Sequence, residues 1–260
     1  MIHDVEHVMG LPVTIAVPDR DAHGAAVAAA FALLREVDAR FSLYRDDSEL
    51  SALNRGTLAL ADADPSVRSV LARCEELRRI TRGSFDAAAA HALWTGGAAV
   101  EGIGLDPTGL VKGWAVQLAA DGLTAAGVSD AFVGAAGDVC VRGEAGPGTP
   151  WEIGIQHPFE RDQLAAVLKI RDAAVATSGT YARGAHIVDP HTGRAPEGLA
   201  SVTVVGPDLG TADAFATAAF AMGDNGPRWL MSLEPDYAAL VITADGELVS
   251  TPGMARLRAS

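Results

Sequence analysis

A carboxylate and a hydroxyl stand four residues apart in the segment TADAFATAAFAMG, residues 211–223, among small side chains. Positions i and i+4 share one face of a helix, so Asp213 and Thr217 point the same way, and the alanines around them let a ligand approach closely. Both are hard oxygen ligands, which suit Mg²⁺ or Ca²⁺ rather than Zn²⁺. The pattern therefore indicates a divalent-cation site. The competing interpretation is that Asp213 caps the helix start and Thr217 bonds to its own turn.

A second candidate is the segment LDPTGLVKGWAV, residues 105–116, where Asp106 and Lys112 flank a glycine-containing turn that enters a helix. Backbone N–H groups at such a turn favour an anion, and Lys112 adds a positive charge. The GxxxxGK[ST] spacing of a Walker loop is absent. The segment indicates an anion site, and the competing interpretation is a helix cap beside a solvated lysine.

The third candidate is the stretch AVATSGTYARGAHIVDPHTG, residues 174–193, in which a short apolar strand precedes a dense set of polar and turn-forming residues. His186 comes just before an Asp189-Pro190 turn that ends in Gly193, an arrangement that could aim an imidazole into a cleft as a general base. The alternative is a hairpin whose histidine is merely exposed. Three other histidines have no comparable neighbours and are expected to be structural or solvent-facing: His91, His157 and His191.

The first half of the chain predicts mainly helices to position these residues. The expected elements are an opening strand in GLPVTIAVP, a helix over 21–41, a short helix in DDSELSALN capped by Asp47 or Ser48, a helix from Asp64-Pro65 to Gly83, and a helix from Leu110 to Gly127. Residues 84–106 are expected to form a short connection rich in alanine and glycine, without a strand.

After residue 127 the hydrophobic period changes to two, which is typical of strands. The apolar runs are AFVGA, DVCVRG, WEIGIQ, AAVLKI, AAVAT, AHIVD and SVTVVG. We expect an antiparallel meander, interrupted by helices in TADAFATAAFAMG and GPRWLMSL and closed by the hairpin YAALVIT-ADG-ELVS on a type I′ turn. Helices followed by strands predict an α+β fold with the helices packed against an antiparallel sheet.

Composition excludes some classes of partner. The 260 residues are expected to form a single domain over 1–260. The chain has 20 Lys and Arg residues against 33 Asp and Glu residues, which gives a formal charge of -13. Such a charge disfavours nucleic acid and anionic membranes as partners. An anionic ligand would need a metal ion or a local cluster of positive charge.

The cysteines and the N-terminus bear on the compartment. Cys74 and Cys140 have neither metal-site spacing nor the density of a disulfide framework, and Cys74 falls on the apolar side of a predicted helix. The opening MIHDVEHVMG lacks a basic and apolar leader, and no run of 18 apolar residues occurs. We therefore expect a cytoplasmic protein with no signal peptide, lipidation signal or membrane span.

Taken together and in order, these segments resemble one family. The motifs are MGLPVTI, FSLYRDDSELSALN, SFD, DPTGLVKGWAV, GDVCVRG, ATSGTYARGAHIVDPHTG and TADAFATAAFAMG, from about Met9 to Gly223. They are similar to the successive motifs of the FAD:protein FMN transferases, the ApbE-like flavin transferases. The most specific are the His-Ile-Val-Asp-Pro-x-Thr-Gly block and the Ala-Asp-Ala-x-Ala-Thr helix.

The resemblance implies an ApbE-like, T-fold-like architecture and a defined activity. Members bind FAD and Mg²⁺, cleave the flavin pyrophosphate, and attach FMN through a phosphoester to a Thr or Ser hydroxyl of an acceptor protein, releasing AMP. His186 matches the proposed base that takes the acceptor proton. The metal ligands match Asp213, Thr217 and the backbone carbonyl of Gly109. The flavin-contacting positions match Met9, Tyr44, Ser84, Phe85, Asp86, Asp106, Lys112 and Val188.

The chain departs from the family pattern in one segment and at one residue. Only 19 residues separate Asp86 from Asp106, where members commonly carry a longer insert, and AAAAHAL replaces an expected TVGPL run. Gln117 stands where an acidic residue is usual.

Two other functions share these residues. A hydrolase would use the same site with water as acceptor and release free FMN and AMP. A flavin-binding carrier or sensor without turnover would need neither a base nor a metal pair, so His186, Asp213 and Thr217 speak against it.

Overall fold

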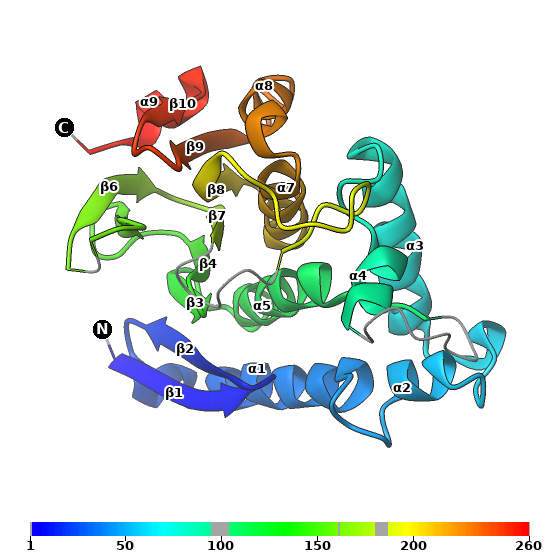
Figure 1. Ribbon diagram of the computed structural model, residues 1–260. Coiled ribbons are helices and arrows are strands. Elements are labelled where there is room, and N and C mark those ends of the chain that lie inside the picture. The colour runs from blue at the N-terminus through cyan, green and yellow to red at the C-terminus, as the bar shows by residue number, and fades with distance from the viewer. Residues whose placement is uncertain (1, 95–103, 161, 180–186, 260) are drawn as a thin grey trace.

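The computed structural model of the protein describes residues 2–94, 104–160, 162–179 and 187–259 (Figure 1). Eight strands form one antiparallel sheet in the order β1-β2-β3-β4-β7-β8-β9-β10. Their bounds are β1 Ile2–Val8, β2 Leu11–Val17, β3 Ala131–Ala135, β4 Asp138–Arg142, β7 Ala173–Gly179, β8 Leu199–Gly206, β9 Ala238–Thr243 and β10 Leu248–Ser250. With helices packed on this sheet, the predicted α+β class is confirmed.

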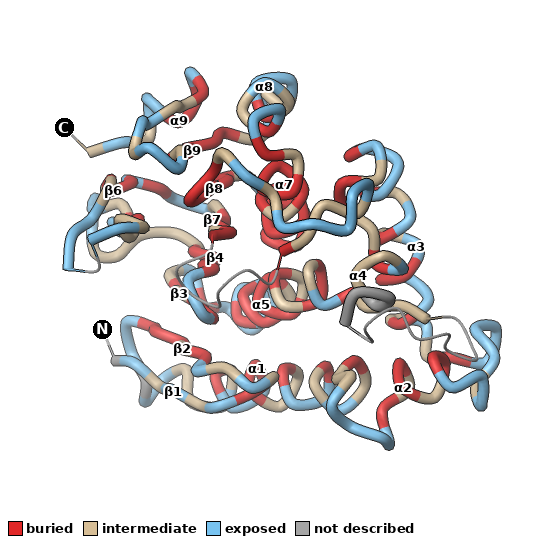
Figure 2. Tube along the Cα trace, in the orientation of Figure 1, coloured by how far each residue is buried: buried red, intermediate tan, exposed pale blue. Residues whose placement is uncertain are grey.

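Helices cover one face of the sheet in two layers (Figures 1 and 2). Helix α7 packs on β7 and β8, α5 on β3 and β4, and α1 on α5, while α3 and α4 lie beyond them. The helix bounds are α1 Arg20–Phe41, α2 Glu49–Asn54, α3 Pro65–Ile80, α4 Ala87–Trp94, α5 Thr108–Ala125, α7 Leu209–Ala221, α8 Gly226–Met231 and α9 Pro252–Leu257. Single 3-10 turns occupy Leu60–Asp62 and Gly223–Asn225.

The caps and apolar faces of the first helices follow the sequence pattern. Asp64 accepts a hydrogen bond from the Ser66 N–H at the start of α3, with Pro65 in the first turn. Ser48, rather than Asp47, caps α2, because its hydroxyl accepts from the Ser51 N–H at 3.0 Å. The apolar positions predicted to face the core are buried: Val27, Phe31, Leu34, Val37 and Phe41 in α1, and Val67, Leu71, Cys74 and Leu77 in α3.

Two glycines allow α5 and α7 to approach closely. A methyl group on Gly113 would lie 2.7 Å from the Leu209 carbonyl oxygen, and one on Gly210 would lie 3.3 Å from the Trp114 backbone nitrogen. Helix α7 is buried almost all around, as expected for an alanine-rich helix between a sheet and other helices (Figure 2). The two helices therefore form one tightly packed pair at the centre of the molecule.

The predicted meander is wrong in one part. Strands β5 (Trp151–Gln156) and β6 (Leu164–Ile170) leave the main sheet as a separate hairpin, and β4 pairs directly with β7. Alternate residues of β5 are buried, because the hairpin and α9 cover a second apolar core on the other face of the sheet.

Two further expectations differ from the structure, and one strand was not predicted. Residues 87–94 of the predicted connection form α4. Residues 2–8 form an edge strand, which lacks the alternation of apolar and polar residues because most of its residues are exposed or half-buried. In the predicted strand AHIVD, residues 185 and 186 lie outside the described residues, and residues 187–188 are not in a strand. A short alanine-rich helix and a polar edge strand both give weak periodic signals.

The turns also differ from expectation. In the β9–β10 connection only Gly246 takes a positive φ, 91°, so the turn is not the expected type I′. Paired positive φ values occur instead at Met9-Gly10 and Ala136-Gly137, which join β1 to β2 and β3 to β4. These two hairpins therefore have the tight turns that match the twist of their strands.

None of the helices in the described ranges combines the length and apolar character needed to cross a bilayer.

Candidate active site

Strand register brings several loops to one end of the sheet. Val13 pairs with Ala135, so the turns at 9–10 and 136–137 lie at the same end. Val139 pairs with Val175, which places the end of β7, residues 178–179, beside the second turn. The candidate residues of distant segments can therefore meet there.

Lys112 of α5 contacts two buried carboxylates at this end. Its ammonium contacts Asp138 Oδ2 and lies 3.3 Å from Asp213 Oδ2. Asp138 is 0% exposed and Asp213 4%, while the Lys112 side chain is 19% exposed. The interpretation of Lys112 as a solvated lysine is therefore wrong. We call these three residues the lysine cluster.

Asp213 and Thr217 point into the same region. Helix α7 is capped by Asp208, whose carboxylate accepts from the Thr211 N–H at 2.7 Å, so the interpretation of Asp213 as a cap is wrong. The Thr217 hydroxyl lies 3.2 Å from that of Ser178 at the end of β7. The pair predicted from its spacing therefore faces the end of the sheet.

The register of α5 against α7 places Gly109 near this pair. Gln117 bonds the Leu209 N–H, and a methyl group on Gly113 would lie 3.1 Å from Asp213 Cβ, so the helices are antiparallel. One more turn of this register sets Gly109 opposite Thr217.

A carboxylate, a hydroxyl and a backbone carbonyl are the oxygen donors that Mg²⁺ accepts. Within the described ranges no group of three or more His, Cys, Asp and Glu residues forms a candidate metal cage. Mg²⁺ usually keeps several waters and takes its other ligands from substrate phosphates. The residues present fit such a shared site.

The Ser84-Phe85-Asp86 segment lies against the start of α5. Phe85 is buried, and a methyl group on Gly109 would lie 3.2 Å from its ring. Asp86 accepts from the N–H groups of Ala88 and Ala89 and so caps α4. Ser84 is buried as well.

A buried asparagine that sequence reasoning missed holds the entry to α5. Asn54 donates to the Leu105 carbonyl and accepts from the Leu105 N–H, both at 2.8 Å. Asp106 accepts from the Thr108 N–H at 2.9 Å, as expected of a residue that caps this turn. The signal for Asn54 was weak, since it lies on a short helix more than fifty residues away.

The Asp189 turn packs beside the Ser84 segment. Asp189 accepts from the His191 N–H and the Thr192 hydroxyl, and the His191 ring would lie 3.0 Å from a methyl group on Gly83. His191 is exposed in this turn, as expected. The turn and the Ser84 segment, distant in sequence, are therefore neighbours.

The remaining candidates have diverse surroundings. Met9 has φ 57° at the β1–β2 turn and packs partly on the core. Tyr44 is 87% exposed between α1 and α2, and Val188 is half-buried. His186 lies outside the described residues.

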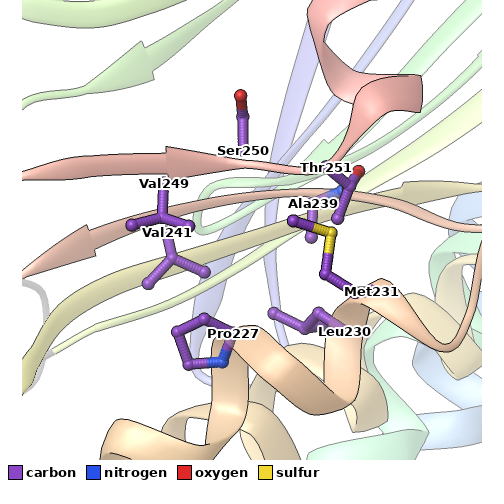
Figure 3. A pocket seen from close by; sticks show the side chains of 8 residues that line it. All are labelled: Pro227, Leu230, Met231, Ala239, Val241, Val249, Ser250 and Thr251. Atoms are coloured by element: carbon purple, nitrogen blue, oxygen red, sulfur yellow. The ribbon is translucent and has the colours of Figure 1, made fainter.

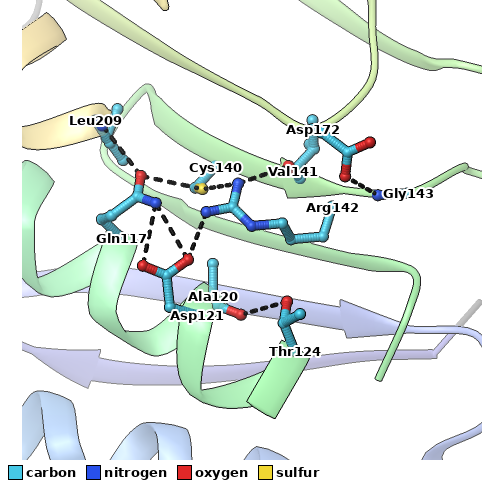
Figure 4. Close-up of polar contacts among 10 residues, drawn as sticks. All are labelled: Gln117, Ala120, Asp121, Thr124, Cys140, Val141, Arg142, Gly143, Asp172 and Leu209. Carbon is cyan, nitrogen blue, oxygen red and sulfur yellow. Dashed lines mark hydrogen bonds and ion pairs between the residues drawn. The ribbon is translucent and has the colours of Figure 1, made fainter. Parts of the chain in front are cut away.

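A different polar cluster ties the other end of α5 to β4 (Figure 4). Asp121 lies 2.6 Å from Arg142 Nη2, Arg142 Nη1 lies 3.1 Å from Cys140 Sγ, and Gln117 Nε2 donates to Asp121. Burial raises the pKa of the Cys140 thiol to about 12. We call Gln117, Asp121, Cys140 and Arg142 the arginine cluster.

An apolar hollow lies between α8 and strands β9 and β10 (Figure 3). It is open to solvent and too narrow to hold even one water molecule, so it is not a small-molecule pocket. Its lining is Pro227, Leu230, Met231, Ala239, Val241, Val249, Ser250 and Thr251. It has no charged side chain to bind a phosphate.

The fold and this arrangement define an ApbE-like protein, and comparison with known proteins agrees. The sequence model of the ApbE family matches residues 9–100 and 95–241, so the chain belongs to the ApbE family. An ApbE protein of Thermotoga maritima has the same fold, with a TM-score of 0.86 at 22% identity over 100% of this chain and 99% of that one.

Two curated relatives carry the name FAD:protein FMN transferase. The protein of Rhodobacter capsulatus is 38% identical over 60% of this chain and 31% of its own length. The protein of Vibrio cholerae is 29% identical over 74% of this chain and 72% of its own length. The chain thus spans about a third of the first relative and under three quarters of the second.

Proposed function

We propose that this protein is a Mg²⁺-dependent FAD:protein FMN transferase. It cleaves FAD, attaches FMN through a phosphoester to a Thr or Ser hydroxyl of an acceptor protein, and releases AMP. The observation that carries the proposal is the lysine cluster, which sets a half-buried ammonium beside the Asp213 and Thr217 pair. Membership of the ApbE family and the names of two relatives support it.

The chain's own groups divide the work of phosphoryl transfer, which needs alignment and neutralised charge rather than covalent help. Lys112 binds and orients the pyrophosphate, while Asp213, Thr217 and the Gly109 carbonyl hold the cation. Bound Mg²⁺ supplies neutralisation of the charge that develops on the phosphates. His186 accepts the proton of the acceptor hydroxyl.

This arrangement reconciles an acidic protein with an anionic substrate. The formal charge of the chain is -13, which repels FAD at long range. A cation and the half-buried Lys112 reverse the sign of the field locally, where the pyrophosphate binds.

The proposal is tested by incubating the protein with FAD and Mg²⁺, with and without a Thr-bearing acceptor domain. AMP release with an FMN-sized mass gain on the acceptor is the expected result. AMP without the mass gain would indicate a FAD hydrolase. No AMP in either sample would leave a flavin-binding carrier.

The base is tested by His186→Ala. The expected result is unchanged affinity for FAD and a rate of transfer at least about 100-fold lower, the usual contribution of a general base. An unchanged rate would remove His186 from the mechanism.

A further inference from the structure

Asp138 is a buried carboxylate at the site whose role no motif announced. It is the first residue of β4 and is 0% exposed. One oxygen accepts from the Thr177 N–H of β7 at 3.1 Å, and the other contacts the Lys112 ammonium. Because both oxygens are engaged within the protein, the sheet holds this carboxylate in one orientation.

Lys112 lies between this carboxylate and that of Asp213. The contact with Asp138 is the closer one, and Asp213 Oδ2 is 3.3 Å away. Without Asp138, the flexible lysine would shift toward Asp213, since a half-buried ammonium favours an anionic partner. It would then compete with the cation for Asp213.

We propose that Asp138 is a positioning residue that acts through Lys112. It holds the ammonium on the β4 side of the cluster, where the ammonium can face the phosphates and leave Asp213 to the cation. This inference rests on the proposed function, because it takes FAD as the anion that Lys112 binds.

Positioning and net charge make opposite predictions for Asp138→Asn. The substitution removes a negative charge, so an effect of charge alone would tighten the binding of anionic FAD. Positioning predicts weaker binding. The introduced amide keeps an oxygen for the Thr177 N–H but turns its nitrogen toward Lys112, so the ammonium loses the acceptor on β4.

The first experiment measures FAD affinity by flavin fluorescence in Mg²⁺ without an acceptor protein, for wild type, Asp138→Asn, Lys112→Met and the double variant. We expect Asp138→Asn to weaken binding about tenfold, the size of one charge-assisted hydrogen bond. The double variant should bind no more weakly than Lys112→Met alone, because Asp138 acts only through Lys112. Tighter or unchanged binding in Asp138→Asn, or additive losses, would overturn the inference.

The matched control is Asp121→Asn, which breaks the other ion pair between α5 and β4. We expect it to leave FAD affinity unchanged. An equal loss in this variant would assign the effect to helix placement rather than to Lys112.

A second readout needs neither substrate nor turnover. The sequence contains two lysines, Lys112 and Lys169, and the latter is half-exposed beside Glu152. In protein labelled with ¹⁵N-lysine, the wild-type Lys112 ammonium should give a resolved NMR signal, because burial and a fixed acceptor slow proton exchange. Asp138→Asn should broaden or shift it and leave Lys169 unchanged.

The wild-type spectrum keeps the test decisive if Asp138→Asn fails to fold. A Lys112 ammonium that exchanges as fast as that of Lys169 would overturn the inference. Wild type that binds FAD but releases no AMP would overturn the proposed transferase function. The inference about Asp138 would then be decided by the FAD affinities of the variants. Wild type that binds no FAD would overturn both.

Discussion

Two ion pairs join helix α5 to strand β4. The helix supplies the cation in one pair and the anion in the other, and the two pairs differ in their neighbouring charges. Lys112 and Asp138 form one, and Asp121 and Arg142 form the other. From Lys112 to Asp121 the helix rises about 14 Å, and from Asp138 to Arg142 the strand rises about the same distance. The helix and the strand can therefore contact each other at both ion pairs.

The arginine cluster satisfies its own members. Arg142 and Asp121 balance in formal charge, and Gln117 joins Asp121 to the Leu209 N–H. In the lysine cluster two carboxylates face one ammonium, so these three residues together carry a formal charge of one negative unit, which suits the proposed cation. The comparison teaches that charge imbalance, rather than an ion pair as such, distinguishes a binding site from a structural tie.

The largest expected effect removes this imbalance. Asp213→Asn should lower AMP release at least about 100-fold, since it removes the proposed charged ligand of the cation and the carboxylate beside Lys112. Mn²⁺ binding followed by electron paramagnetic resonance should weaken in parallel. Asp121→Asn is the matched control and should change neither quantity. Retained Mn²⁺ affinity in Asp213→Asn would contradict the assigned metal site.

Helix α5 is also packed more tightly at the end that carries Lys112 than at the end that carries Asp121. A methyl group on Gly113 would lie 2.7 Å from the Leu209 carbonyl oxygen, whereas one on Gly122 meets no atom within 4 Å. Gly113→Ala should lower the free energy of unfolding by roughly 1–3 kcal/mol through overpacking.

Gly122→Ala should instead raise the free energy of unfolding by about 0.5–1 kcal/mol, because alanine is the better helix former. Urea denaturation measures both variants. Equal effects at the two glycines would show that α5 is not packed more tightly at its lysine end.

Within the arginine cluster, the amide of Gln117 is expected to stabilise the folded protein. Gln117→Glu would keep an acceptor for the Leu209 N–H but place a carboxylate where Nε2 lies 3.2 Å from Asp121. The repulsion should cost about 1 kcal/mol at neutral pH, measured by urea denaturation. Adding Asp121→Asn should restore most of this loss; a double variant as unstable as the single one would point to a different cause.

The smallest expected effect concerns the two buried cysteines, which should not react with a thiol reagent in the folded protein. Burial raises the pKa of both thiols, Cys74 and Cys140, to about 12, so at pH 8 they stay protonated in the folded protein. A disulfide reagent at pH 8 should label neither cysteine until denaturant is added. Rapid labelling of Cys140 alone would show that the arginine cluster opens on its own.

The sequence predicted local features where neighbouring residues determine them. The apolar spacing of Val27, Phe31 and Leu34 marked α1, and Asp64-Pro65 marked the start of α3. The pairing of Asp213 with Thr217 also followed from helical spacing alone. These inferences succeeded because they needed only one helix and its period.

The inferences that failed involved weak local patterns or distant partners. The apolar residues of 2–8 are three positions apart rather than alternating, and 87–94 is a short alanine-rich run, so neither segment showed the period of its element. Asn54 and Asp138 lie within motifs of the family resemblance, yet nothing local predicted that each bonds to a segment far away in the chain.

What the sequence determined by itself was the inventory of parts: capped amphipathic helices, alternating strands and the motifs that resemble a flavin transferase. Only the tertiary structure decided that Lys112 lies between Asp138 and Asp213. The reason is that this contact depends on the antiparallel register of α5 against α7 and on the pairing of β4 with β7. Both arise from packing at Gly113 and Gly210 and across the sheet, which no local pattern encodes.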